Sequence, residues 1–310
     1  MNTFLIVISF FLSLVILSSS QSYFIKKKIY DPINTRSSHT GIATRNGGVS
    51  IFLTLLLISV CFYLQGSEMF DYSYLTPISI LLVVGLYDDI YGVDFKLKFL
   101  FQIITAKILI DSGFIIDNLH GILGIHELNR IFAQVFTAFI IVAIINSINF
   151  IDGIDGLAIS VISVFIILFE FFSINQTEFQ TISIIILASF IPLLYFNYRS
   201  KNKIFLGDSG SLFLGGIVSI YVLNILSNDY IIKNEYDLNK MIFVISILGY
   251  PTIDITRVFF LRIFKGTSPF VADRNHIHHR ILDKFKSHLM TSLFIVSMSI
   301  LLTILTQILF

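Results

Sequence analysis

The chain has 310 residues, of which 55% are hydrophobic and only 13% are charged, and its mean hydropathy is +0.85. A soluble domain carries about a quarter of its residues as charged side chains, so this composition excludes a soluble protein and predicts a polytopic membrane protein, with residues 1–310 as one integral-membrane domain. The net charge of +1 shows no overall bias, and no nucleic-acid partner is expected.

Ten apolar runs are long enough to be candidate membrane spans. Backbone hydrogen bonds cannot stay open in lipid, so the spans must be helices and the fold class is all-α. The first run lacks the basic region of a cleaved signal peptide and is expected to be a retained span, with a cleaved signal as the alternative. The predicted spans are residues 3–22, 47–65, 74–88, 98–116, 131–149, 157–173, 180–196, 211–227, 241–261 and 289–309.

The connecting segments differ in charge, which predicts the topology. One set of alternate loops carries sixteen Lys and Arg residues and the other carries three. By the positive-inside rule the first set is cytoplasmic, which places both termini on the extracytoplasmic side. The sixteen are Lys26, Lys27, Lys28, Arg36, Arg45, Lys96, Lys98, Arg199, Lys201, Lys203, Arg262, Lys265, Arg274, Arg280, Lys284 and Lys286, and the three are Arg130, Lys233 and Lys240.

The unusual polar residues all fall in the predicted cytoplasmic loops. Each of these loops combines Asp, Asn, His or Arg with Gly, whereas the outer loops have scattered polar residues. Helix capping explains any one such cluster equally well, so a single motif is weak. The five inner loops read "DPINTRSSHTGIATRNGG", "GLYDDIYG", "INSINFIDGIDGLA", "FNYRSKNKIFLGDSGSLFLGG" and "KGTSPFVADRNHIHHRIL".

Carboxylates in three of these loops are more than capping requires. Asp88 and Asp89 end an apolar run, where like charges repel and desolvation is costly, and one cap residue would suffice. Asp152 and Asp155 are three residues apart and would share a face if the segment were helical. Asp208 in "GDSGS" adds a carboxylate beside small residues that leave backbone N–H groups open to an anion.

Carboxylates that converge at one membrane face would require a cation. Mg²⁺, with Mn²⁺ as a substitute, takes carboxylate and carboxamide oxygens, and Asn149 offers such an amide. No cysteine spacing suggests zinc. Cationic and imidazole groups can neutralise phosphate oxygens, and together with the metal and the bilayer they indicate chemistry on a phosphorylated lipid. These groups are Lys98, Arg274, His276, His278 and His279.

Two other charged pairs are interpreted as structural. Asp254 and Arg257 in "DITR" are expected to form a buried ion pair that supports the site. Lys107 and Asp111, four residues apart in the fourth predicted span, are expected to form an internal pair.

The motifs in this order resemble the polyprenyl-phosphate N-acetylhexosamine-1-phosphate transferases, a superfamily that includes the phospho-N-acetylmuramoyl-pentapeptide translocases. The resemblance extends from residue 31 to 282. It is carried by Asp88–Asp89, "NSINFIDGIDGLA", "FNYRSKNKIFLGDSGSLFLGG", "PTIDITR" and "SPFVADRNHIHH".

The resemblance implies a role for each matching residue. Asp88 and Asp89 match the paired aspartates that engage the lipid phosphate, and Asp208 matches the magnesium-binding aspartate. The three histidines match the motif that closes over the nucleotide-sugar diphosphate. As predicted sites, the catalytic residues are Asp88, Asp89, Asp208, His276, His278 and His279; the substrate-binding residues are Lys98 (just before Gln102), Asn146, Asp152, Asp155 and Arg274; and the metal ligands are Asp208, Asn149 and Asp152.

The implied reaction joins a UDP-N-acetylhexosamine and undecaprenyl phosphate, releases UMP and begins a lipid-linked surface glycan at the bacterial inner membrane. Direct displacement is favoured, and a covalent aspartyl intermediate stays open. "HIHH" in place of three adjacent histidines, together with "NTRSSH", favours the surface-glycan branch over the pentapeptide translocases. Those translocases and a multi-span transporter remain the alternatives. The sequence leaves open the sugar, the glycan pathway and the oligomeric state, with a homodimer among the options.

Overall fold

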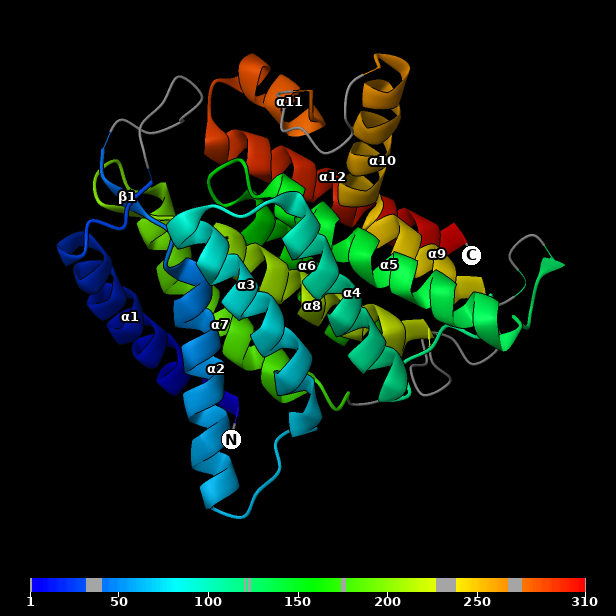
Figure 1. The fold of residues 1–310 in the computed structure, drawn as a ribbon, viewed down its shortest axis with the longest axis horizontal. Coiled ribbons are helices and arrows are strands. Elements are labelled where there is room, and N and C mark those ends of the chain that lie inside the picture. Colours follow the sequence, from blue (N-terminus) through cyan, green and yellow to red (C-terminus); the bar gives the residue numbers. More distant parts are fainter. Residues whose placement is uncertain are drawn as a thin grey trace.

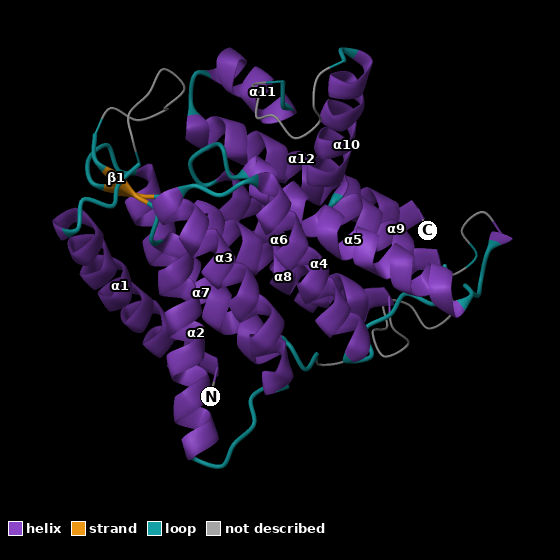
Figure 2. Cartoon of the chain, in the orientation of Figure 1, coloured by secondary structure: helices purple, strands orange, loops and turns teal. Residues whose placement is uncertain are grey.

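The computed structural model describes residues 2–31, 41–119, 121, 124–173, 177–226, 238–266 and 275–309. Within them the chain forms a bundle of α-helices with one short two-stranded sheet (Figures 1 and 2). The helices are α1 (Asn2–Lys26), α2 (Gly47–Leu64), α3 (Leu75–Tyr91), α4 (Phe95–Asp111), α5 (Arg130–Ile151), α6 (Leu157–Phe172), α7 (Gln180–Tyr198), α8 (Gly207–Leu226), α9 (Leu238–Ile247), α10 (Gly249–Phe264), α11 (Ile277–Phe285) and α12 (His288–Leu309). The strands are β1 (Ala43–Thr44) and β2 (Lys203–Ile204), and a 3₁₀ turn, η1 (Tyr72–Tyr74), precedes α3.

All ten predicted spans correspond to helices, but the ninth is broken into two. The predicted segment 241–261 contains α9 and α10, whose axes differ by 68°. Pro251 lies in the first turn of α10, four residues after Ile247, the last residue of α9. A proline ring clashes with the carbonyl four residues earlier and removes a backbone donor, which disfavours a straight continuous helix at this point.

Fewer helices than the ten predicted spans meet a test of length and apolar composition for crossing a membrane. In the described residues seven helices meet it, or eight if α9 and α10 count as one bent span. The shortfall comes from α6, which has 16 residues, and α4, which has 17 residues including Lys96, Lys98, Lys107 and Asp111. The chain is a polytopic helical membrane protein, and the side on which each terminus lies stays a prediction.

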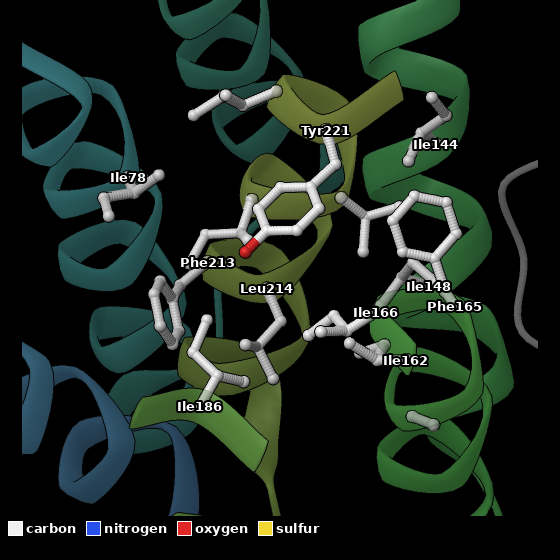
Figure 3. Packing of buried hydrophobic residues seen from close by; sticks show 14 of the residues in the cluster. Ile78, Ile144, Ile148, Ile162, Phe165, Ile166, Ile186, Phe213, Leu214 and Tyr221 are labelled. Carbon is white, nitrogen blue, oxygen red and sulfur yellow. The ribbon is translucent and has the colours of Figure 1, made fainter. Parts of the chain in front are cut away.

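Helix α8 lies at the centre of the bundle, and all of its residues except Asp208 and Asn224 are buried. Figure 3 shows Phe213, Leu214 and Tyr221 of α8 among apolar side chains from the surrounding helices. The Tyr221 ring packs against Phe169 and Phe179 at centroid distances of 4.6 and 4.7 Å. Its hydroxyl is 2.8 Å from the Ser183 hydroxyl, so this buried polar group is satisfied.

Glycines allow α2 and α3 to approach the first turns of α8. A Cβ atom on Gly85 of α3 would lie 2.3 Å from the carbonyl oxygen of Asp208, and one on Gly48 of α2 would lie 2.1 Å from the Cα of Gly210. Such distances permit no side chain, so the backbones are in direct contact. Residues that follow Gly85 in α3 are therefore held beside the start of α8.

The strands join the first polar loop to the fourth. β1 pairs in parallel with β2, Ala43 opposite Lys203 and Thr44 opposite Ile204. The pairing continues where the N–H groups of Gly47 and Gly48 donate to the carbonyls of Phe205 and Leu206. This places the starts of α2 and α8 side by side at the end of the bundle where Figure 1 shows β1, α10 and α11.

Candidate active site

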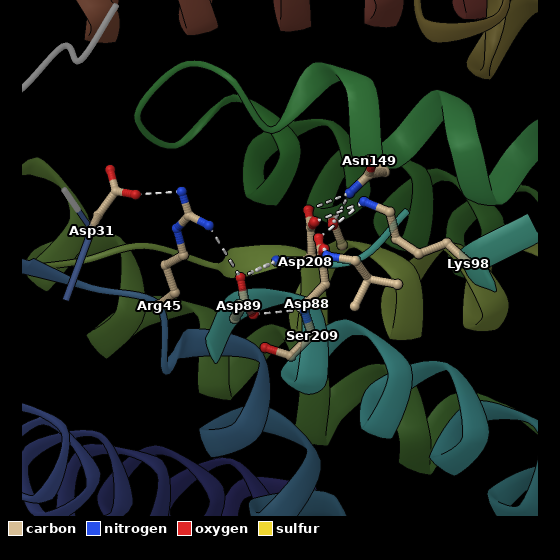
Figure 4. Close-up of polar contacts among 10 residues, drawn as sticks. Asp31, Arg45, Asp88, Asp89, Lys98, Asn149, Asp208 and Ser209 are labelled. Atoms are coloured by element: carbon tan, nitrogen blue, oxygen red, sulfur yellow. Dashed lines mark hydrogen bonds and ion pairs between the residues drawn. The ribbon is translucent and has the colours of Figure 1, made fainter. Parts of the chain in front are cut away.

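Asp89 caps the N-terminus of α8. Its carboxylate oxygens accept the backbone N–H groups of Asp208 and Ser209, both at 2.9 Å, and its side chain is fully buried (Figure 4). The first N–H groups of a helix lack partners within the helix, and a carboxylate there also interacts favourably with the helix dipole. Gly207 permits this contact because its φ is +77° and a Cβ atom would lie 2.7 Å from an Asp89 oxygen.

Asp88 and Asp208 converge on the same cation, Lys98 (Figure 4). The Lys98 Nζ lies 3.0 Å from Oδ2 of Asp88 and 3.1 Å from Oδ2 of Asp208. The other oxygen of Asp88 accepts the N–H of Val93, just beyond the end of α3. Helices α3, α4 and α8 thus each contribute one charged group to a single point.

Asn149 holds the second oxygen of Asp208. Its Nδ2 donates to Oδ1 of Asp208 at 2.7 Å and lies 2.8 Å from the Ser211 hydroxyl. We refer to Asp88, Asp89, Lys98, Asn149 and Asp208 as the carboxylate cluster. It unites residues predicted from three separate loops.

Asp152 and Asp155 do not share a helical face, because α5 ends at Ile151 and α6 begins only at Leu157. Asp152 stays near the carboxylate cluster: burial, followed by the charges of Asp208 and Asp89, raises its pKa well above the usual value. Asp155 is directed elsewhere. Its carboxylate forms an ion pair with Lys203 and lies 3.3 Å from Nδ1 of His288. Its predicted role in substrate binding stays a prediction, and its contacts are those of a structural link between the turn, β2 and α12.

The donor chemistry of the carboxylate cluster fits Mg²⁺. Asp88 and Asp208 already present oxygens to one cation, and burial together with the nearby charges of Asp208 and Asp89 raises the pKa of Asp152, a cost that a bound divalent cation would offset. Asp208 and Asp152 would supply the carboxylate ligands, and Asn149 could contribute its amide oxygen. These remain predicted ligands.

The sequence prediction missed Arg45 and Lys203 as partners of the site. Arg45 forms an ion pair with Asp31 and lies 3.8 Å from Asp89, and its side chain is 38% exposed. Both residues were counted only as cytoplasmic charge, and their positions follow from the β1–β2 pairing, for which the sequence has no periodic signal.

Asn146, predicted to bind substrate, is buried and forms a reciprocal amide pair with Gln102. Its Nδ2 donates to Oε1 of Gln102 at 2.7 Å, and the return bond is 3.3 Å long. This pair joins α4 to α5. The substrate role of Asn146 stays a prediction.

The histidines form a second cluster on α10 and α11, defined by Asp254, His276, His278 and Tyr250. Nδ1 of His276 is 2.9 Å from Oδ2 of Asp254, and Nδ1 of His278 is 3.0 Å from the Tyr250 hydroxyl. The two imidazoles stack with centroids 5.2 Å apart. The predicted Asp254–Arg257 pair is present at 3.1 Å, with the Asp254 side chain 1% exposed.

His278 is buried and neutral at physiological pH. Burial, followed by the neighbouring His279 and His276, lowers the pKa of His278 to about 3. Its Nε2 atom finds no hydrogen-bond partner within the described part of the chain. A Cβ atom on Gly153 would lie 3.5 Å from this nitrogen, so the imidazole faces the turn after α5.

The C-terminal end of α5 connects the two clusters. Asn149 contacts Asp208 in the carboxylate cluster, and the next residue, Phe150, stacks on His276 with centroids 5.7 Å apart. Arg274 lies outside the described residues. The pair Lys107–Asp111 is formed, but its side chains are 66% and 60% exposed, so the prediction of an internal pair is wrong. Within the described residues no helix covers these two side chains of α4.

A helical membrane protein with acidic, cationic and imidazole groups gathered at one end of its bundle has the features of a phosphoryl-group transferase acting at a membrane surface. Residues 72–226, half of the chain, match the family described as glycosyl transferase family 4. The chain belongs to this family and is a phosphoglycosyltransferase.

Curated relatives resemble the chain over most of its length. It is 32% identical to a probable undecaprenyl-phosphate N-acetylglucosaminyl 1-phosphate transferase of Bacillus subtilis (strain 168), over 87% of this chain and 74% of the relative. It is 34% identical to an undecaprenyl-phosphate alpha-N-acetylglucosaminyl 1-phosphate transferase of Haemophilus influenzae, over 81% and 71%. The Escherichia coli K12 protein of the same name is 26% identical over 83% and 70%. Membership of this family favours the transferase interpretation over a transporter.

Proposed function

We propose that the protein transfers N-acetylglucosamine 1-phosphate from UDP-N-acetylglucosamine to undecaprenyl phosphate and releases UMP. The observation that carries the proposal is the convergence of Asp88 and Asp208 on Lys98, beside Asn149 and Asp152, in a chain built as an integral membrane protein. The names of relatives that match more than 80% of the chain support this choice of sugar and lipid.

The reaction forms one phosphorus–oxygen bond and breaks another. An oxygen of the lipid phosphate attacks the phosphorus that bears the sugar, and the bond from that phosphorus to the bridging oxygen breaks, so that UMP leaves. A phosphate monoester has a second pKa of about 6, so the attacking group is already largely dianionic near neutral pH. A general base is therefore a minor requirement, and direct displacement suffices.

The main obstacle is charge, because one anion must approach another. Lys98 offers an ammonium group to phosphate oxygens while Asp88 and Asp208 hold its position. Mg²⁺ held by Asp208, Asp152 and Asn149 would supply further neutralisation of the diphosphate. The imidazoles of His276 and His278 lie against Phe150 and Gly153, where they would face the leaving nucleotide.

Membranes from cells that overproduce the protein provide the test. They receive undecaprenyl phosphate, Mg²⁺ and one labelled UDP-sugar at a time: N-acetylglucosamine, N-acetylgalactosamine, N-acetylfucosamine or N-acetylquinovosamine. We expect UMP and a lipid-linked sugar with UDP-N-acetylglucosamine. Membranes that contain the Asp208→Ala variant are the control for background activity. Failure to release UMP with every sugar would reject the transferase reaction, and turnover of a different sugar alone would reject the proposed donor.

A further inference from the structure

Asp254 is the centre of the histidine cluster, and both of its oxygens are engaged. Oδ1 accepts the backbone N–H of Ile277 at 2.9 Å and the Arg257 guanidinium at 3.1 Å. Oδ2 contacts Nδ1 of His276 at 2.9 Å. The side chain is 1% exposed, so these protein groups determine its orientation.

One carboxylate therefore positions both the start of α11 and the imidazole before it. Ile277 is the first residue of α11, and His276 is its N-cap residue. Arg257 reinforces the arrangement, because its guanidinium also donates to the carbonyl of Asn275. The plane of the His276 ring is held between Phe150, at 5.7 Å, and His278, at 5.2 Å.

The contact to Asp254 decides which nitrogen of His276 can exchange a proton. An ionised carboxylate only accepts hydrogen bonds, so the Nδ1 atom of His276 must carry a hydrogen. Any proton that the ring gains or loses is then at Nε2. The ligand atoms of Asp254, His276 and His278 lie within 4.8 Å of one another, as in a metal site. The donors from Arg257 and Ile277 and the hydroxyl of Tyr250 already account for this closeness.

We propose that Asp254 is a positioning residue: it keeps a hydrogen on Nδ1 of His276, so that Nε2 is the nitrogen that exchanges a proton with a phosphate oxygen of the nucleotide sugar. This inference rests on the proposed function. It assigns different tasks to the adjacent imidazoles: His276 is the proton-exchanging group, whereas His278 is held neutral by burial against Tyr250.

The substitution Asp254→Asn tests the orientation of the proton. The amide oxygen must occupy the Oδ1 position, because Ile277 and Arg257 donate there. The amide nitrogen then faces His276 and donates to Nδ1, which requires the hydrogen of the neutral ring to be on Nε2. The substitution keeps the shape of the side chain at position 254 and most of its contacts, but it moves the hydrogen of the neutral His276 ring from Nδ1 to Nε2. We expect kcat to fall on the order of 10²-fold, with little change in KM for either substrate.

A double-mutant cycle separates positioning from a general structural role. Wild type, Asp254→Asn, His276→Ala and the double variant are compared by UMP release, with far-UV circular dichroism to measure melting. We expect Asp254→Asn to cause no further loss once His276 is alanine. If His276→Ala melts early, His276→Gln takes its place in the cycle. Asp111→Asn is the matched control, since it makes the same chemical change at an exposed site on α4.

The outcomes are distinct. A wild type that turns over none of the UDP-N-acetylhexosamines overturns the proposed function and this inference with it. An active wild type in which the losses of Asp254→Asn and His276→Ala multiply overturns the inference alone. The same holds if Asp254→Asn raises KM while kcat is unchanged.

Discussion

Asp88 and Asp208 lie on helices whose backbones are in direct contact. His276 and His278, in contrast, are held by a local hydrogen-bond network around the carboxylate of Asp254. In the carboxylate cluster, Gly85 brings α3 against α8, and Asp89 ties the two helices together through the N–H groups of Asp208 and Ser209. In the histidine cluster, α10 turns away from α9 by 68°, and Asp254 determines where α11 begins.

This difference shows that the two halves of the site depend on folding in different ways. The geometry of the carboxylate cluster is a product of helix packing, so disturbing it should also destabilise the protein. The geometry of the histidine cluster depends on a local network, so disturbing it should change turnover with a smaller effect on melting. The following variants examine that distinction, from the largest expected effect to the smallest.

Asp208→Ala removes the group on which Lys98 and Asn149 converge. We expect UMP release to fall on the order of 10²–10³-fold or more, because a preorganised charge at the reacting phosphates is lost. Mg²⁺ should raise the melting temperature of the wild type, since a ligand stabilises the folded state that binds it, and this shift should vanish in the variant. Full activity of Asp208→Ala would remove Asp208 from the mechanism.

Asp88→Asn and Asp89→Asn are neighbouring substitutions with different expected results. Asp89→Asn replaces one oxygen of a double cap with an NH₂ group that faces a backbone donor, so the free energy of unfolding should fall by about 1–2 kcal/mol and activity should fall with it. Asp88→Asn can still accept the Val93 N–H and leaves the cap of α8 intact, so it should lose activity while its melting temperature falls less than that of Asp89→Asn. Equal melting temperatures for the two variants would contradict the capping role of Asp89.

His278→Gln tests the neutral imidazole by pH. The pKa of His278 is about 3 in the folded protein against 6.5 for an unperturbed histidine, so the unfolded state binds more protons between these values. Wild-type stability should therefore be fully present above pH 6.5 and decline as the pH falls toward 3. In His278→Gln this decline should be shallower, which melting curves across that range would measure. Parallel curves for the two proteins would refute the buried neutral state.

Asp111→Asn is expected to have the smallest effect. Its partner Lys107 and its own side chain are exposed, and such pairs contribute little. Stability should change by less than about 0.5 kcal/mol, and UMP release should be unchanged. A large effect here would show that this face of α4 has a covering partner.

Much of the fold could be predicted because apolar runs and charge asymmetry are local properties. Each of the ten predicted segments contains a helix, and the break in the ninth lies beside Pro251, a residue that disfavours a straight helix. Seven or eight of the helices in the described residues meet the measure of length and apolar composition, because α4 carries four charged residues and α6 has only 16 residues.

The sequence singled out most residues of the candidate site, but it did not indicate which contacts each of them makes. "DD" and "NFIDGIDG" mark unusual carboxylates, yet neither string indicates that Asp89 caps α8 or that Asp155 pairs with Lys203. These contacts join residues separated by 119 and 48 positions, and no periodicity in the chain encodes such distances.

By itself, then, the amino-acid order determined that this chain is a membrane protein and where its helices lie. It also marked the polar residues whose desolvation at the membrane boundary is unfavourable enough to indicate a function. Hydropathy and desolvation act residue by residue, so they can be read without a structure. Only the folded arrangement decided which carboxylate faces a cation, which one caps a helix and which one orients an imidazole, because those assignments depend on contacts between α3 and α8, and between α10 and the start of α11, that exist only after packing.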